Sequence, residues 1–319
     1  MTMALHATQI GTRAETLLRC PNSTWNVLTA VSGAVYVSGW NGELIWITDR
    51  RHALHPRAIL VPALPKCPPE RGHVVSCRDH LLRCGDFTVE WRQAALWQAT
   101  RFVDAHTVGP GDLSNALDAI EQVLFDASDR KLVSANIGWP QADRQLAEAV
   151  GLLGQVSAEH GVFSTLQEVS QIVGLGRGLT PQGDDVLGGY LFMLRALDAA
   201  CCIDLELDWE LVATWLHSVG HRTNTISHCL LVDYANGDAC APLAALVQSV
   251  LDGEGRARLT QLAIEVLEIG ASSGRGLLEG VQSAFRVAVG SREADLKLSA
   301  DELRKTVGRP ARREVARVR

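Results

Sequence analysis

The stretch VGLGRGLTPQGDDVLGGYLFMLRAL, residues 173–197, places six glycines and two adjacent aspartates directly before an apolar run with helical spacing. Glycines at alternate positions permit positive φ angles and leave backbone N–H groups unobstructed. Where such a loop leads into a helix N-terminus, those groups and the helix dipole favour an anion. We therefore predict that phosphate or carboxylate binds at Gly176, Gly178, Thr180 and Gly183. The glycine spacing differs from that of a nucleotide P-loop and of a dinucleotide fingerprint, so neither is predicted.

The two aspartates have both a structural and a functional explanation. With Thr180 as N-cap and a proline in the first turn, Asp184 and Asp185 would lie where negative charge is favourable by about 0.3–1 kcal/mol. Two neighbouring carboxylates cannot occupy one capping position, so the second could orient an amine, accept a proton or hold a cation. The residue types leave capping alone and a functional role equally open. We take both aspartates as candidate catalytic residues.

A second polar cluster, GHRTNTISHC at residues 220–229, interrupts an apolar segment that is predicted to be helical. On such a helix Thr223 and Ser227 would share a face. An arginine among hydroxyl groups suits a substrate carboxylate, so Arg222, Thr225 and Ser227 are candidate substrate-binding residues. A helix-capping network or a solvated stripe explains the same residues equally well.

The remaining sequence predicts an α+β fold. Short β-prone runs and the Asn41-Gly42 hairpin signal predict an N-terminal sheet or partly closed barrel over residues 1–95. From there the apolar spacing changes to three or four residues, which predicts a mainly α-helical domain over 96–292. Residues 293–319 are expected to form a polar, basic and disordered tail.

Two glycine-rich helix starts resemble each other weakly. The sequence GDDVLGG at residues 183–189 can be aligned with GRGLLEG at residues 274–280. Glycines inside the two helical patterns cost about 1 kcal/mol each relative to alanine, and close backbone approach would compensate for that cost. We therefore expect these two segments to face one another.

Composition limits the class of protein. With 319 residues, 47% hydrophobic and 21% charged, the chain is typical of a globular protein. Without residues 303–319, which carry seven basic side chains and one Glu, the net charge falls from -6 to about -12, which argues against nucleic acid as a partner. No apolar run approaches the ~18 residues of a membrane span, and the location is predicted to be cytoplasmic. Eight cysteines without a CxxC pair indicate neither a disulfide framework nor a zinc site, and we predict no metal and no cofactor.

Three segments resemble one bacterial family. GLGRGLTPQGDDVLGGYLFMLRAL at 174–197 looks like the signature of the family, formerly of unknown function, that includes the AllH-type subunit of oxamate carbamoyltransferase. That signature usually reads close to GLGxGLTPSGDDFLxGxLxAL. Residues 222–251 are similar to the next segment of the family, and IGASSGRGLLEGVQSAFRV at 269–287 resembles its closing motif, usually near GHSSGxDxLxG.

The resemblance implies a carbamoyltransferase subunit that acts on oxamate or a related small nitrogenous acid in purine or allantoin nitrogen metabolism. Its substrates would be anions such as carbamoyl phosphate and an oxamate-like acid. It implies partners as well, an acyl-CoA-synthetase-like subunit and a second companion, and leaves open whether this chain is active alone. Within that implied function, the glycine loop would hold phosphate. Ser272, Ser273 and the adjacent Gly274 would polarise the carbamoyl oxygen, and Arg222 would hold the acceptor carboxylate.

The departures from the family pattern matter as much as the matches. Ala271 stands where the family commonly has His, Gly276 replaces an acidic residue, and Gln182 replaces Ser. If the lost groups contribute to chemistry in relatives, this chain handles another substrate or has another role. The alternative to a transferase subunit is therefore a non-catalytic protein that binds small anions or acts as a scaffold.

Overall fold

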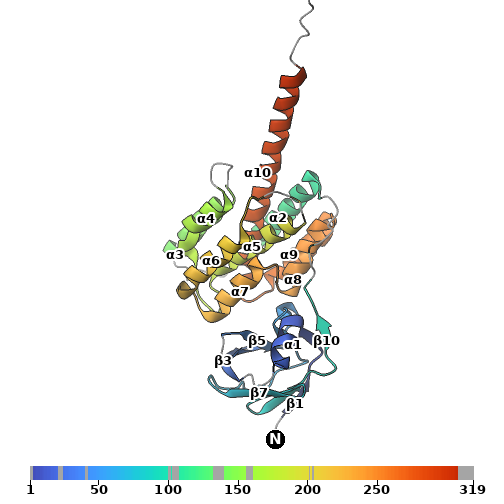
Figure 1. Ribbon diagram of the computed structural model, residues 1–319, viewed down its shortest axis with the longest axis vertical. Coiled ribbons are helices and arrows are strands. Elements are labelled where there is room, and N and C mark those ends of the chain that lie inside the picture. The colour runs from blue at the N-terminus through green and yellow to red at the C-terminus, as the bar shows by residue number, and fades with distance from the viewer. Residues whose placement is uncertain are drawn as a thin grey trace, which may run out of the picture.

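The chain folds into an N-terminal β domain and a C-terminal helical domain, with the two domains packed end to end (Figure 1). The computed structural model describes residues 3–20, 24–39, 42–99, 102, 108–131, 140–155, 161–200, 202 and 205–307. The predicted α+β class is confirmed.

The strands of the β domain form a single sheet that curls into a half-barrel. Its order is β1-β9-β8-β7-β3-β4-β5-β6-β2-β10. The strands are β1 (Met3–His6), β2 (Gln9–Gly11), β3 (Trp25–Val31), β4 (Ala34–Gly39), β5 (Leu44–Thr48), β6 (Ala58–Leu60), β7 (Val74–Arg78), β8 (Leu81–Cys84), β9 (Phe87–Glu90) and β10 (Ala95–Trp97). Helix α1 (Thr12–Arg19) and the short 3-10 helix η1 (Arg51–Ala53) complete the domain.

Chemistry of the turns and strands explains this sheet. The expected hairpin joins β4 and β5, which pair antiparallel, and Gly42 has φ 81° in its turn; Asn41 lies outside the described residues. Every residue of β5 is buried, because this central strand has the domain core on one face and the helical domain near the other. Both outer strands are parallel additions: β1 pairs with β9, and β10 with β2.

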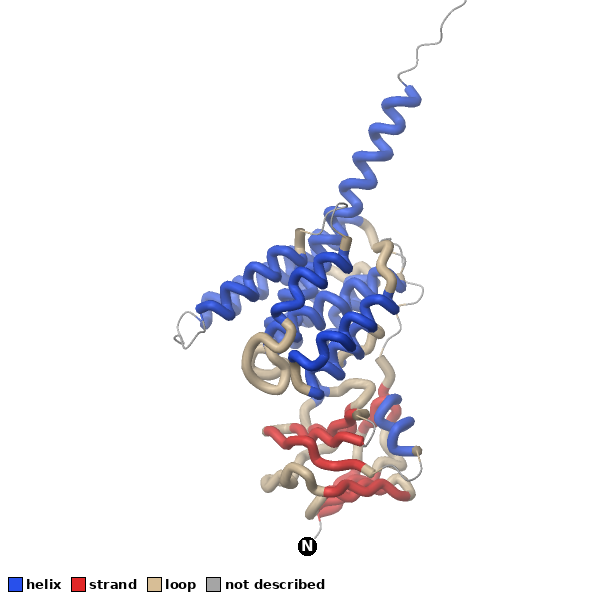
Figure 2. Tube along the Cα trace, turned by 60° about the vertical axis from the view of Figure 1, so that its left-hand side comes forward, coloured by secondary structure: helices blue, strands red, loops and turns tan. Residues whose placement is uncertain are grey.

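The helical domain contains α2 to α10 and two further 3-10 helices. They are α2 (Pro110–Lys131), α3 (Pro140–Leu153), α4 (Val162–Glu168), η2 (Val169–Ile172), α5 (Gln182–Ala199), α6 (Trp209–Val219), η3 (Gly220–Arg222), α7 (Thr225–Ala235), α8 (Ala241–Leu251), α9 (Arg256–Leu267) and α10 (Ser273–Val307). Helix α10 leaves the domain at the end opposite the sheet (Figures 1 and 2). The helix continues to Val307 and so includes the first part of the predicted tail. The remainder of that tail, 308–319, lies outside the described residues.

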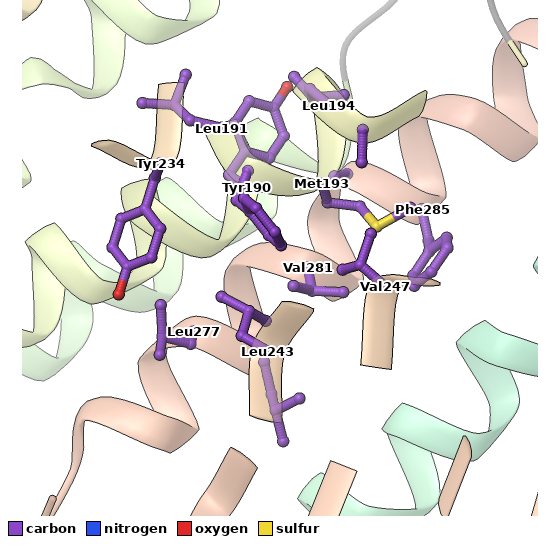
Figure 3. Packing of buried hydrophobic residues seen from close by; sticks show 14 of the residues in the cluster. Tyr190, Leu191, Met193, Leu194, Tyr234, Leu243, Val247, Leu277, Val281 and Phe285 are labelled. Atoms are coloured by element: carbon purple, nitrogen blue, oxygen red, sulfur yellow. The ribbon is translucent and has the colours of Figure 1, made fainter. Parts of the chain in front are cut away.

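Helix α5 is the centre of this domain. From residue 183 to 194 all of its side chains are buried, so the amphipathic pattern of a surface helix is missing. Figure 3 shows its residues Tyr190 and Met193 among side chains of three other helices, including Tyr234 of α7, Leu243 of α8 and Phe285 of α10. Neighbours on several sides thus remove this helix from water.

The segment 208–237 is not one continuous helix. It contains α6 and α7, separated by η3 and a break at Thr223 and Asn224. The expectation that Thr223 lies on a helix is therefore wrong. The physical reason is a cap: the Asn224 side chain accepts hydrogen bonds from the backbone N–H groups of Ile226 (3.0 Å) and Ser227 (3.1 Å), which begins α7 afresh.

A buried ionic cluster joins the two domains. Asp233 of α7 is 0% exposed and Arg57, which follows η1, is 2% exposed. The Arg57 guanidinium donates from Nε to Asp233 Oδ2 (2.5 Å) and from Nη2 to Oδ1 (2.9 Å), while Arg13 of α1 donates to Oδ1 (3.2 Å). Arg57 also reaches Glu43 Oε2 (2.9 Å). Two arginines and two acids balance one another, so the charges of this cluster are paired.

Candidate functional site

The glycine loop lies between η2 and α5, and several of its glycines pack directly against neighbouring backbone atoms. Gly174, Gly176 and Gly178 have φ angles of 77°, 122° and 95°, which L side chains rarely adopt. A Cβ at Gly174 would collide with the carbonyl oxygen of Arg222, and one at Gly183 with that of Ile172. These glycines are thus required by conformation and close packing, whether or not an anion binds.

Part of the predicted anion cradle is occupied by the protein itself. The N–H of Gly174 donates to Asp184 Oδ1 (2.7 Å), that of Leu175 to Ile172 O (2.9 Å) and that of Gly183 to Leu175 O (2.9 Å). Gly176 and Gly178 are exposed at the tip of the loop. The part of the loop that could bind an anion is therefore the portion around these two glycines, and not the whole loop.

Asp184 fastens the loop to the start of α7. It is 2% exposed, and its carboxylate accepts from Gly174 N, from Ser227 Oγ (2.6 Å) and from Thr223 Oγ1. Hydrogen bonds to a charged group contribute about 1.5–3 kcal/mol each. Both of its oxygens are held by protein donors, which gives Asp184 a positioning role in the structure.

Asp185 is in a different environment on the same helical turn. It is 4% exposed, and its Oδ2 has no hydrogen-bond partner among the described residues. Burial raises the pKa of Asp185 well above its ordinary value; hydrogen bonds from Ser273 and Thr180 act in the opposite direction, and the charge of Asp184 raises the pKa further. A shift in this direction favours the protonated form of the carboxyl group, which is able to donate a hydrogen bond.

The start of α10 completes this cluster. The Ser273 and Thr180 hydroxyl oxygens are 2.7 Å apart, so the loop and the first residue of α10 are linked directly. Thr180 was expected to be the N-cap of α5, but the N-cap position is Pro181, one residue later, without a side-chain cap. That shift leaves the Thr180 hydroxyl available to Ser273. Ser272 precedes the helix and its carbonyl accepts from Gly276 N (3.1 Å).

The expected approach of the two glycine-rich helix starts is confirmed. A Cβ at Gly189 of α5 would collide with Leu277 O of α10, and one at Gly280 of α10 with Val186 O of α5. Gly274 approaches Val266 O at the end of α9 in the same way. Only hydrogen atoms fit at these positions, so the helices cross with their backbones in contact and Ser273 is held beside Asp185.

The structure does not bring all predicted substrate-binding residues into this cluster. Arg222 is exposed and its Nη1 donates to Ser170 O in η2 (2.9 Å), and Thr225 is the exposed first residue of α7. Two residues were missed as contributors to the loop. Asn224 donates from Nδ2 to Leu179 O (2.9 Å), and Thr223 binds Asp184. Their signal was the Asn-Thr-Ile-Ser sequence, which is typical of an N-cap before an apolar run.

Three helix N-termini therefore meet the glycine loop. Helix α5 follows it, α7 contacts it through Asn224 and α10 through Ser273. Each N-terminus carries a partial positive charge of about half an elementary charge, which favours negative groups nearby. A cavity of about 650 Å3 lies beside the first turns of α5 and α10, where Gln182, Arg275 and Glu279 contribute to its wall.

The described residues contain no group of three or more His, Cys, Asp or Glu side chains arranged to hold a metal ion. None of their helices combines the length and the apolar character needed to cross a membrane.

Comparison with known proteins identifies the segment that carries these features. Residues 172–285 match the family model described as oxamate carbamoyltransferase subunit AllH. The resemblance expected from the sequence is confirmed over this AllH-matching segment. It begins at the end of η2 and includes the glycine loop, α5 and the start of α10. The β domain lies outside the match, and neither a curated protein nor a solved structure matches the chain.

Proposed function

We propose that this protein is a subunit of a carbamoyltransferase that acts on oxamate or a related small nitrogenous acid in purine or allantoin nitrogen metabolism. The observation that carries the proposal is Asp185, a buried carboxyl group beside Ser273 and Thr180 within the AllH-matching segment, with one oxygen that no described residue contacts by a hydrogen bond. Buried groups with strongly perturbed pKa values occur preferentially at functional sites.

A protonated Asp185 suits the oxygen of the carbamoyl group. In carbamoyl transfer, the acceptor nitrogen attacks the carbamoyl carbon, the bond from that carbon to the phosphate oxygen breaks, and the nitrogen loses a proton to the released phosphate or to water. Negative charge grows on the carbamoyl oxygen as the nitrogen attacks. A hydrogen bond donated by Asp185, together with the hydroxyl of Ser273, would stabilise that charge.

The other site residues receive supporting roles in the same proposal. The exposed amides at Gly176 and Gly178 and the nearby helix N-termini would attract the phosphate of the donor. Arg222 would hold the acceptor carboxylate after release from Ser170. Asp184 would position the loop rather than contact substrate. The proposed location is the cytoplasm, with an acyl-CoA-synthetase-like subunit and a second companion as partners.

One observation favours the second candidate, a non-catalytic protein that binds small anions or acts as a scaffold. The family's acidic residue is replaced by Gly276, and a Cβ there would lie 2.8 Å from Asp185 Cβ and 3.1 Å from Gln182 O. The crossing of α5 and α10 therefore leaves no room for an acidic side chain unless one of the helices shifts. A chain that lost this group could retain the loop without the chemistry.

Turnover in a reconstituted complex separates the two candidates. Asp185→Leu keeps approximately the shape of the side chain but removes its hydrogen-bond donor, and we expect turnover of carbamoyl phosphate with oxamate to fall about 100-fold or more. Asp252→Leu, at the exposed end of α8, is the matched control and should leave turnover unchanged. Unchanged turnover in folded Asp185→Leu protein would remove the proposed catalytic residue. Calorimetric binding of carbamoyl phosphate without turnover in any mixture would favour the scaffold.

A further inference from the structure

A second cavity lies between the two domains, away from the helix junction. Its volume is about 620 Å3, within the range of small-molecule sites in proteins. Arg51 and His52 of η1 line it from the β domain. From the helical domain it is lined by Leu262 and Glu265 of α9 and by Glu268, which directly follows α9. Asp185, Thr180 and Ser273 are not among the lining residues, so this cavity is separate from the proposed catalytic cluster.

One hydrogen bond across the interface and one within the β domain hold the walls of this cavity. The N–H of Ala241, the first residue of α8, donates to Leu54 O directly after η1 (2.9 Å). Trp46 Nε1 donates to Ala53 O within η1 (3.1 Å). The first two residues of α8 provide no free hydrogen-bond donor to the cavity. The Ala241 N–H is already used, and the next residue, Pro242, has no backbone N–H group. The charges of η1 and α9 therefore determine what the cavity can bind.

The two domains contribute charges of opposite sign. From the β domain come Arg50 and Arg51, of which Arg50 is paired with Asp49 at 3.4 Å, and His52, whose pKa is lowered by burial and by the charge of Arg50. From the helical domain come Glu265 of α9 and Glu268, which directly follows α9. Arg258, one turn before Leu262 on α9, is paired with Glu254 at 3.6 Å. Arg51 and Glu268 have no ion-pair partner within 4 Å among the described residues.

We propose that this cavity binds a small apolar amino acid as a zwitterion. Its carboxylate contacts Arg51 and His52, its ammonium group lies between Glu265 and Glu268, and its side chain rests on Pro242, Ala245 and Leu262. A simple anion would meet the repulsion of the two glutamates, and a simple cation that of the arginine. Only a ligand with both charges satisfies both walls.

The amino acid acts as a clamp between the domains in this arrangement. Because one wall belongs to each domain, the ligand binds only when the domains are packed as they are here. Binding therefore stabilises the folded pair of domains by mass action. Binding of the amino acid does not depend on carbamoyl transfer, because none of the residues that line this cavity belongs to the catalytic cluster.

Three probes of matched shape test the proposal on the full chain. Valine carries both charges, 3-methylbutanoate lacks the ammonium group and 2-methylpropylamine lacks the carboxylate. By calorimetry and thermal unfolding, we expect valine to bind and to raise the melting temperature, and each analogue to bind about tenfold more weakly or worse. Absence of valine binding at millimolar concentration would overturn the proposal. So would equal binding of 3-methylbutanoate and valine, because the glutamates would then contribute nothing.

Two variants test the walls separately. Glu268→Gln and Arg51→Gln should each weaken valine binding about tenfold or more, with circular dichroism confirming that they fold. Glu210→Gln, exposed on α6 and outside the cavity, is the matched control and should bind valine like the unchanged chain. Valine affinity that is unaltered in both wall variants would place the amino acid elsewhere and refute this site.

Discussion

Asp233 at the domain interface and Asp185 at the helix junction are both buried acids, but their surroundings are opposite. Asp233 accepts hydrogen bonds from two arginines, whereas Asp185 has one oxygen without a hydrogen-bond partner among the described residues and a pKa that burial raises. A paired buried charge fastens two elements together. A buried carboxyl group without a charge partner costs stability and is retained where it serves another purpose. The contrast separates the structural acid from the candidate catalytic one within a single domain.

The largest effect is expected from breaking the interface. Asp233→Ala leaves Arg57 buried without its main partner, and loss of one member of a buried ion pair costs about 3–5 kcal/mol. The measurement is the free energy of unfolding in urea. Asp252→Ala, at an exposed position, should change it by less than about 0.5 kcal/mol. If the two variants lose equal stability, the ionic cluster does not hold the domains together.

The next effect concerns pH at the same interface. Burial lowers the pKa of His55, which lies beside Asp233, to about 4. Because this folded-state pKa is below the ordinary value of about 6.5, neutral His55 contributes to the stability of the folded protein above pH 6.5. That contribution is lost as the pH falls to 4, which lowers the free energy of unfolding by about 3 kcal/mol.

His55→Phe retains an aromatic ring against Trp46 but cannot titrate. The stability of the unchanged chain should therefore fall relative to this variant between pH 6.5 and 4, as measured by urea unfolding across that range. Parallel stability curves for the two proteins would contradict the assignment of this pH dependence to His55.

A third experiment tests the helix crossing that holds Ser273 beside Asp185. Gly280→Ala forces a methyl group against Val186 O, and we expect a loss of about 1–3 kcal/mol. Gly290→Ala, further along α10, meets open space and should stabilise the helix by about 1 kcal/mol. Opposite signs on one helix would show that backbone contact, and not helix propensity, selects the glycine at the crossing. Stabilisation by both alanines would disprove the close approach.

The last effect concerns Asp185 itself, is the smallest when expressed per pH unit, and has the opposite pH sign to His55. Its folded-state pKa is raised, chiefly by burial. The stability that protonated Asp185 contributes is therefore fully present below the ordinary pKa of about 3.9, and it is lost as the pH rises through the folded-state pKa. Asp185→Asn should gain on the unchanged chain with rising pH, by at most about 1.4 kcal/mol per pH unit for one proton. A stability difference that stays constant from pH 4 to pH 8 would mean that Asp185 ionises normally.

The sequence predicted those features that depend on local chemistry. The β4–β5 hairpin follows from a turn signal, and the contact of α5 with α10 from glycines placed inside apolar helices. Features that depend on distant partners were not predictable. Asp233 is one charge in an apolar run, but nothing in the sequence pairs it with Arg57. The different environments of Asp184 and Asp185 likewise arise from Thr223, Ser227 and Ser273, which the chain brings together only on folding.

The parallel pairing at both edges of the sheet also sets the order of events during synthesis on the ribosome. Met3 pairs with Phe87, and Gln9 with Ala95. Strand β1 therefore has no partner in the sheet until β9 is translated, and β2 lacks one of its two neighbours until β10 is translated. The edges of the nascent β domain are therefore completed only after the end of the domain has been translated, at a time when the helical domain has not yet been made.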